Sequence, residues 1–313
     1  MESRASVASS LNDRRAAAWA SWRDLPRPQR LRIAGLFGYV GLLAVLFVQP
    51  LAKLVVHASQ NSLHSHVVLV PFITAYFLLI ERRRPAAAYT TSIGGALIAS
   101  GAGFAALAAA NVFEVTLSVN DYLALMTLAF VSFVVAGGFL FLGSRWMAAE
   151  AFPFAFLIFM VPLPDAAVNW LETASVLASA EAAALFFKMT GTLMIRDGTL
   201  FELPGIVLRV GQECSGIRSS WVLFITSVLA SHLMLESRWR RLVLVAFVFP
   251  LAIVRNGFRI LVLGLLCVHI GPHMIDSMIH RRGGPLFFAL SLVPLFLLLI
   301  WLRRGEQRKI VRA

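Results

Sequence analysis

Charged residues are scarce in this chain. Asp, Glu, Lys and Arg together make up only 14% of the 313 residues, whereas soluble domains contain about 25%. Hydrophobic residues make up 59%, and apolar runs recur along the whole length. These features exclude a soluble enzyme, with or without a single membrane anchor. Because helices satisfy their own backbone hydrogen bonds in lipid, the composition predicts an all-α, polytopic membrane helical bundle.

Acidic residues are the scarcer of the two charge types. The chain has 16 Asp and Glu against 28 Lys and Arg, which gives a formal net charge of +12. In a soluble protein this excess would suggest a nucleic-acid partner. Here the arginines occur in short clusters between apolar runs, as the positive-inside rule expects of cytoplasmic loops. We therefore predict no nucleic-acid partner and use the clusters as topology markers.

Cysteine is also rare, since only Cys214 and Cys267 are present. Two cysteines form at most one disulfide, which excludes a disulfide scaffold. The chain has no HExxH motif and no closely spaced cysteine pair of the kind that binds metals. Four histidines in predicted outer loops leave a metal site as an alternative, although no spacing supports it: His64, His66, His273 and His280. We predict no metal and no cofactor.

The basic clusters and apolar runs together predict the topology. Residues 1–32 are polar and basic without a cleavage pattern, which indicates a cytoplasmic tail rather than a signal peptide. Residues 33–302 then form the transmembrane domain, and residues 303–313 form a basic cytoplasmic tail. About eight transmembrane helices with both termini cytoplasmic place every major cluster inside. We expect these spans at residues 33–56, 67–80 (or 63–80 if the span begins at Leu63), 92–110, 122–142, 151–161, 217–235, 242–270 and 285–302.

The segment from residue 165 to residue 210 is ambiguous. Its apolar part carries Glu172 and Glu181, and several glycine and proline turn signals follow. If Cys214 lies outside, this segment crosses the membrane either twice or not at all. We expect a helix over residues 168–187 at the outer surface or partly packed into the bundle. An outer loop or hairpin over residues 188–204 would follow.

Three polar residues that are distant in sequence converge on the predicted outer side. Cys214 precedes the span that begins at residue 217. Arg259 lies 18 residues after the inner marker Arg241, which is roughly 27 Å along a helix, against a hydrocarbon core of about 30 Å. Arg255 lies one turn deeper on the same face. His280 falls in the outer loop before the last span, so all these groups face one leaflet.

Each of these residues also has an ordinary structural explanation. A membrane cysteine is often inert packing, as we expect of Cys267 in its apolar surroundings, and a Cys214–Cys267 disulfide is an alternative. Cys214 differs because it precedes a helix, whose positive end would lower the thiol pKa. The arginines are alternatively topology charges, although an arginine inside a span costs about 2.5–3.5 kcal/mol and usually faces a cavity or a partner. His280 is alternatively an exposed loop histidine.

At these residues the sequence resembles the exosortase/archaeosortase family of membrane-embedded cysteine transpeptidases. The motifs are Glu213-Cys214-Ser215-Gly216-Ile217-Arg218-Ser219, then Asn256-Gly257-Phe258-Arg259-Ile260, then His280 with Gly284 and Phe288. Ser65-His66, Met160-Val161-Pro162-Leu163-Pro164 and Phe201-Glu202-Leu203-Pro204 add support. The resemblance covers residues 60–300, and Val67 departs from it where the family has glycine.

The resemblance implies that Cys214 is the nucleophile, Arg259 a catalytic arginine and His280 the catalytic histidine. The supporting or substrate-binding candidates are Arg255, Glu213, Arg218, Asn256 and His66. The implied reaction is cleavage of the C-terminal sorting signal of secreted proteins at the outer face of a bacterial inner membrane. Transfer to an acceptor then proceeds through a thioester on Cys214. The implied partners are these substrates, which carry a short motif, a hydrophobic helix and a basic tail, and membrane lipids.

Two other classes of protein remain as alternatives. A transporter, or a membrane protein that handles lipid or polysaccharide, would explain the helices and the arginines. A structural subunit of a polysaccharide export machine would explain them equally well. Neither alternative explains why a cysteine occupies a polar segment directly before a helix. The sequence identifies neither the sorting motif nor the acceptor nucleophile.

Overall fold

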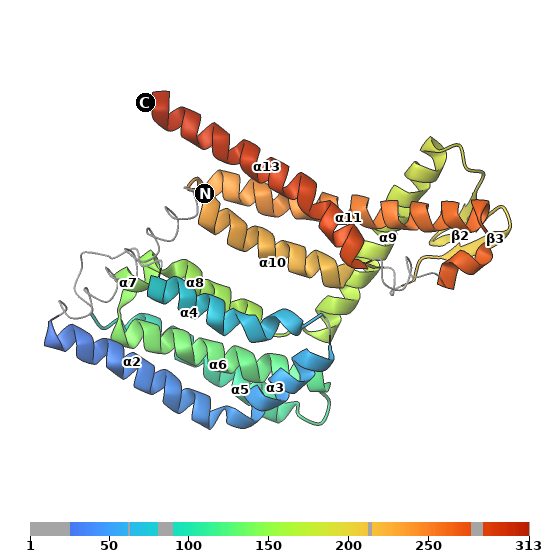
Figure 1. Cartoon of the computed structure of the whole chain (residues 1–313). Coiled ribbons are helices and arrows are strands. Elements are labelled where there is room, and N and C mark those ends of the chain that lie inside the picture. The colour runs from blue at the N-terminus through green and yellow to red at the C-terminus, as the bar shows by residue number, and fades with distance from the viewer. Residues whose placement is uncertain (1–25, 62, 81–89, 212–214, 277–283, 313) are drawn as a thin grey trace, which may run out of the picture. The chain divides into compact units, whose positions relative to one another are not determined.

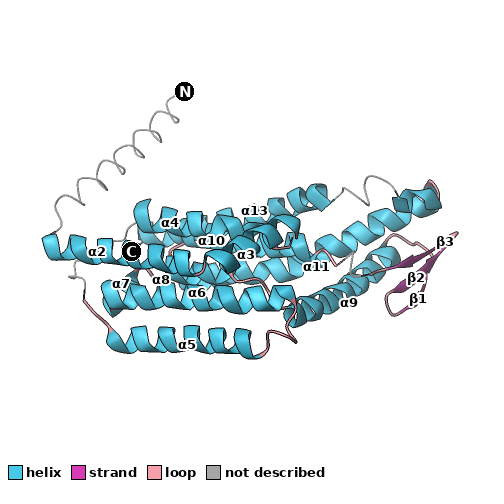
Figure 2. Ribbon diagram, turned by 90° about the horizontal axis from the view of Figure 1, so that it is seen from below, coloured by secondary structure: helices cyan, strands magenta, loops and turns pink. Residues whose placement is uncertain are grey.

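The computed structural model describes residues 26–61, 63–80, 90–211, 215–276 and 284–312. These residues form mainly helices joined by loops, with three short strands (Figures 1 and 2). Seven of the described helices are long and apolar enough to cross a membrane. They are α2 (Arg27–Leu46), α5 (Ile93–Val112), α6 (Val119–Phe141), α9 (Asp165–Met189), α10 (Ile217–Met234), α11 (Arg238–His269) and α13 (Gly284–Arg312). The prediction of an all-α, polytopic membrane protein is thereby confirmed.

Three of the expected spans differ from the helices that form. The span expected to end at residue 80 is only the 3-10 helix η1 (Ser65–Leu69) followed by α4 (Val70–Ile80). The span expected at residues 33–56 is broken at Phe47, where α2 ends and α3 (Val48–Gln60) begins. Pro50 explains the break, because it has no amide to donate to the carbonyl of Leu46. The span expected at residues 151–161 is only α8 (Ala151–Phe156) with the 3-10 helix η2 (Leu157–Met160). These ten residues extend about 15 Å, half the thickness of a hydrocarbon core of about 30 Å.

The chain forms two compact units, residues 1–165 and residues 166–313. In the first unit α6 is the central helix, and α2, α3, α5 and η2 all pack on it (Figure 1). Helix α5 approaches α6 closely, because a Cβ on Gly103 would lie 2.9 Å from the Phe133 ring. The short helices η1 (Ser65–Leu69) and α4 (Val70–Ile80) pack on α8 and η2, and α7 (Ser144–Ala149) follows α6.

A polar corner lies where the first unit leads into α9. The Asn120 amide donates to the Asp165 carboxylate at 2.8 Å, and the Asp165 amide donates to the Asp121 carboxylate at 2.8 Å. The His57 and His64 rings lie 5.6 Å apart between their centroids. These contacts fix Asp165, the last residue of the first unit, at the N-terminal end of α6, which is the predicted outer end.

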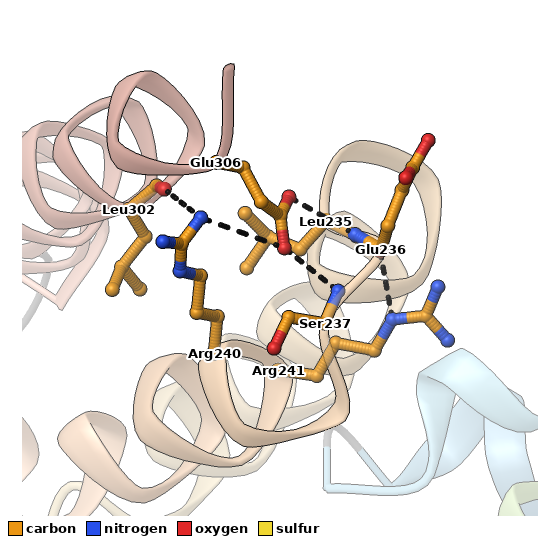
Figure 3. A network of polar contacts seen from close by, with 7 residues as sticks. All are labelled: Leu235, Glu236, Ser237, Arg240, Arg241, Leu302 and Glu306. Atoms are coloured by element: carbon orange, nitrogen blue, oxygen red, sulfur yellow. Dashed lines mark hydrogen bonds and ion pairs between the residues drawn. The ribbon is translucent and has the colours of Figure 1, made fainter. Parts of the chain in front are cut away.

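In the second unit α10, α11 and α13 pack into a bundle around Leu223, Leu244 and Leu295. A carboxylate closes the short connection between α10 and α11 (Figure 3). Glu306 of α13 accepts hydrogen bonds from the Glu236 amide at 3.1 Å and the Ser237 amide at 2.7 Å. It also pairs with Arg240 at 3.7 Å. The three helices are therefore tied together at the end marked by basic residues.

A second core of this unit joins α9, the C-terminal half of α11 and a three-stranded antiparallel sheet (Figure 2). Its strands β1 (Ile195–Asp197), β2 (Leu200–Leu203) and β3 (Ile206–Arg209) follow one another in the order β1-β2-β3. Phe201 and Leu208 are paired across β2 and β3, and both are buried in this core. The expected hairpin over residues 188–204 is thus a larger meander, which extends to Arg209.

Helix α9 packs along the C-terminal half of α11. Cβ atoms on Gly257 and Gly264 would meet Ala182 and Phe187 of α9 at 2.6 Å and 2.5 Å respectively. α11 has 32 residues and extends about 48 Å. It is therefore longer than a hydrocarbon core of about 30 Å is thick, and its last residues lie beyond that core. The contacts of α9 thus fall at the predicted outer end of α11, although α9 itself has the length of a span.

Candidate active site

Three of the predicted site residues lie outside the described residues: Glu213, Cys214 and His280. The chain on both sides of Cys214 is described. Before it, the Val210 amide donates to the Thr199 carbonyl at 3.0 Å, which extends the pairing of β2 and β3. After it, Ser215 is buried and Gly216 precedes the first turn of α10. In the sequence, the predicted nucleophile thus falls between the sheet pairing at Val210 and the buried Ser215.

Gly216 has a backbone conformation that requires glycine. Its φ is +65°, in the left-handed region that other residues rarely adopt. A Cβ at this position would also lie 3.1 Å from the Asn256 Oδ1 atom and 3.3 Å from the Arg255 Nη2 atom. The turn after Cys214 therefore depends both on an unusual φ and on the close approach of α11.

Arg255 holds this turn from the side of α11. Its Nη2 atom donates to the Gly216 carbonyl at 3.2 Å and to the Ser220 hydroxyl at 2.8 Å. The Ser220 hydroxyl in turn donates to the same carbonyl at 2.9 Å, and Ser219 does so at 3.0 Å. Arg255 is 7% exposed, and its Nη1 atom is buried with no partner among the described residues. The arginine is thus a buried cross-link between α10 and α11.

Helix α9 holds the same turn from a second direction. The Ser175 hydroxyl donates to the Ser215 carbonyl at 2.7 Å. The Asn256 amide donates to the Ser179 hydroxyl at 3.0 Å, where Ser179 is fully buried. The sequence analysis missed Ser175 and Ser179. Their spacing of four residues, which places two small residues on one helix face, is the signal that predicts such a contact.

Arg259 lies one turn beyond Arg255 on α11 and is partly buried. Arg218, in the first turn of α10, has an exposed side chain. His66 belongs to η1 of the first unit, where its Nδ1 atom lies 3.1 Å from the Leu63 carbonyl. The structure therefore brings Arg255 and Asn256 into contact with the segment that follows Cys214. It places Arg259 on the next turn of the same helix.

The N-cap residue of α10 is Gly216, which has no side chain to cap the helix. Among the described residues, the Ser215 hydroxyl accepts from the Ile217 amide at the long distance of 3.5 Å. The first amides of a helix carry a partial positive charge and bind negative groups. Together with the guanidinium of Arg255, they make the end of α10 nearest Cys214 electropositive. In the described part of the chain, no group of three or more His, Cys, Asp or Glu is arranged to hold a metal ion. Cys267 is a free, buried thiol on α11.

Comparison with known proteins identifies the family. Residues 58–297, most of the chain, match the sequence model of the transmembrane exosortases. The chain belongs to the transmembrane exosortase family. No curated protein and no solved structure matches it. The matched range begins within α3 and ends within α13, so it includes Cys214, the two arginines and His280, while α2 precedes it.

Proposed function

We propose that this membrane protein is a cysteine transpeptidase that cleaves the C-terminal sorting signal of secreted proteins. Membership of the transmembrane exosortase family supports the reaction class. The observation that carries the proposal is the anchoring of the turn after Cys214. Hydrogen bonds from Ser175 and Arg255 hold its two carbonyls, at the N-terminus of a helix whose N-cap residue is a glycine. Such an arrangement suits a nucleophile that must act in a fixed direction as an anion.

The proposed reaction has two steps that share one thioester intermediate. The Cys214 thiolate attacks the scissile carbonyl carbon, the C–S bond forms, and the C–N bond breaks as His280 donates a proton to the leaving amine. An acceptor nucleophile then gives its proton to His280 and attacks the thioester, which restores the thiolate. Arg259 donates hydrogen bonds to the oxyanion in both steps, where such stabilisation is usually the largest single contribution.

The two arginines of α11 suit different roles. Arg255 is buried, and its Nη2 atom already donates hydrogen bonds to the Gly216 carbonyl and the Ser220 hydroxyl. Arg259 is more exposed and one turn nearer the C-terminal end of α11. Arg255 thus suits a positioning residue, which also favours the Cys214 thiolate by its charge. Arg259 suits a group that meets substrate.

The roles that we propose for the other supporting residues depend on their contacts and exposure. Asn256 holds α9 against α11 through Ser179, whereas Arg218 is exposed beside the same turn and suits contact with substrate. Glu213 and His66 remain predicted supporting residues. The substrate class is a secreted protein with a short motif, a hydrophobic helix and a basic tail. The positive-inside rule supports an outer site and cytoplasmic termini, and the proposed membrane is a bacterial inner membrane.

The test is co-expression of a substrate with the Cys214→Ala and Cys214→Ser variants. Both variants should abolish processing, as followed by mass spectrometry of the substrate's C-terminus. Normal processing in both would remove Cys214 as nucleophile. It would favour the alternative of a transporter or a lipid- or polysaccharide-handling protein. The mass of the new C-terminus also distinguishes hydrolysis from transfer, because a bound acceptor adds its own mass.

A further inference from the structure

The first unit contains an apolar cavity of about 400 Å³ that the proposed chemistry does not use. One face of α2 lines it with four residues at helical spacing: Ile33, Leu36, Phe37 and Val40. One face of α4 lines it with the same spacing: Pro71, Thr74, Ala75 and Leu78. Each set extends about 10 Å along its helix. The cavity is therefore a slot that runs parallel to the two helices.

The slot has a closed floor and an open side. Phe130 and Val134 of the central helix α6 form part of its floor. At its rim Phe37, Pro71 and Ala75 are exposed, so the slot opens between α2 and α4. Its volume lies in the range of about 300–1,000 Å³ that is usual for ligand sites. An opening towards the bilayer makes membrane lipid the nearest source of a ligand.

Among the described residues that line the slot, Thr74 has an unsatisfied side-chain oxygen. Thr74 is 5% exposed, and its Oγ1 atom has no hydrogen-bond partner in the part of the chain that the structure describes. A threonine within a helix commonly bonds the carbonyl four residues earlier, and a buried hydroxyl without a partner is destabilising. Leu78 is the lining residue of α4 at the slot's inner end. Thr74 precedes it by one turn, so Thr74 lies about 6 Å from that end. An ester carbonyl of a lipid, situated below its phosphate, would satisfy this hydroxyl.

Positive charge lies at the same inner end. Arg30 precedes Ile33 by three residues and so continues the lining face of α2 by one turn. Arg32 is held nearby, because its Nη1 atom donates to the Thr91 hydroxyl at 3.0 Å and lies 3.4 Å from the Phe141 carbonyl. Basic residues beside the membrane surface attract anionic lipid headgroups. The arginine side chains thus lie beyond the inner end of the apolar slot, where the headgroup of a lipid with its acyl chain in the slot would lie.

Other occupants fit the slot less well. A transmembrane helix about 10 Å wide and 30 Å long occupies on the order of 2,000 Å³, so the hydrophobic helix of a sorting signal exceeds the volume. Water is excluded because apolar cavities of this kind stay dry. We propose that the slot binds one acyl chain of an anionic glycerophospholipid, with its ester carbonyl at Thr74 and its phosphate beside Arg30. The bound lipid joins α2, which precedes the family-matched residues, to α4.

The experiment uses the full chain purified in detergent, with lipid occupancy read by native mass spectrometry and stability read by thermal unfolding. Ala75→Trp fills the slot from its exposed rim. Ala34→Trp is the matched control, because Ala34 is an exposed alanine on α2 outside the slot. Phosphatidylglycerol and phosphatidylcholine with identical chains are the two probes. Neither measurement depends on transpeptidase activity, so the result is independent of the proposed function.

Wild type and Ala34→Trp should retain one phosphatidylglycerol and unfold at a higher temperature when it is added. Ala75→Trp should lose most of both effects while keeping the unfolding temperature of lipid-free wild type. Thr74→Val should weaken binding several-fold, and Arg30→Gln should reduce the preference for phosphatidylglycerol. Equal occupancy in Ala75→Trp and wild type would overturn the proposal. Equal stabilisation of wild type by both lipids would overturn it as well.

Discussion

At both ends of the α10–α11 pair, a charged side chain binds backbone groups of a neighbouring helix end. The two ends differ in whether the helix N-terminus found there is satisfied by a negative charge. At the inner end, Glu306 accepts from two backbone amides beside the start of α11 and pairs with Arg240. At the outer end, Arg255 binds the Gly216 carbonyl, and the N-cap residue of α10 is a glycine, which brings no capping side chain. A carboxylate thus satisfies the helix end in one place. In the other, the positive end of the helix remains available for negative charge that develops in a reaction.

The largest effect is expected from Arg259→Lys. Lysine keeps the charge but lacks the planar pair of donors, so the processing rate should fall by about 100-fold or more, as when one oxyanion donor is lost. The measurement is the rate of substrate processing at equal expression. Arg303→Lys, an exposed arginine on α13, is the matched control and should be silent. Full activity in Arg259→Lys would end its assignment to the oxyanion.

Gly216→Ala tests whether the geometry of the outer end matters. The left-handed conformation costs a residue with a Cβ about 1–2 kcal/mol, and the new methyl group meets Asn256 and Arg255. We expect processing to fall by about tenfold, with a lower unfolding temperature. Gly101→Ala is the control, because a Cβ there meets open space. Wild-type processing in Gly216→Ala would show that the turn does not position the nucleophile.

Glu306→Gln tests whether the inner end is structural only. The change removes a charged acceptor of two amides and should lower the free energy of unfolding by about 1–2 kcal/mol. Processing per folded molecule should stay at the wild-type level. Glu236→Gln, whose side chain is exposed, should change neither property. If Glu306→Gln lowered processing per folded molecule, the inner end would contribute to catalysis, and the contrast between the two ends would be wrong.

The smallest effect is expected from pH, through His64 of the first unit. Burial first, then the neighbouring His57 and His66, lower the pKa of His64 from 6.5 to about 4, and Asp165 opposes this. The unfolded chain therefore takes up a proton below about 6.5, whereas the folded protein does so only near 4. Stability should fall as the pH drops through this window. His64→Phe should flatten that part of the profile of unfolding temperature, and an unchanged slope would contradict the assignment.

Much of the fold followed from residue patterns. Apolar runs between arginine clusters predicted α10 and α11 closely, because a membrane enforces both span length and charge placement. The interruption at Phe47 was missed although its cause, Pro50, is visible in the sequence. The short α8 and the third strand were also missed. Apolar composition alone does not reveal whether a segment crosses the bilayer or packs against neighbouring elements.

The sequence by itself determined the helical membrane architecture, the family motifs and the helical spacing of Arg255 and Arg259, because these depend on composition and on distance along one helix. Only the tertiary structure decided which of these arginines holds the turn after Cys214. It also showed that Ser175 of α9 binds the Ser215 carbonyl and that Ser179 accepts from Asn256. It likewise revealed the slot between α2 and α4. Contacts between elements depend on how glycine, alanine and serine let helices approach, and that approach is fixed by packing rather than by local pattern.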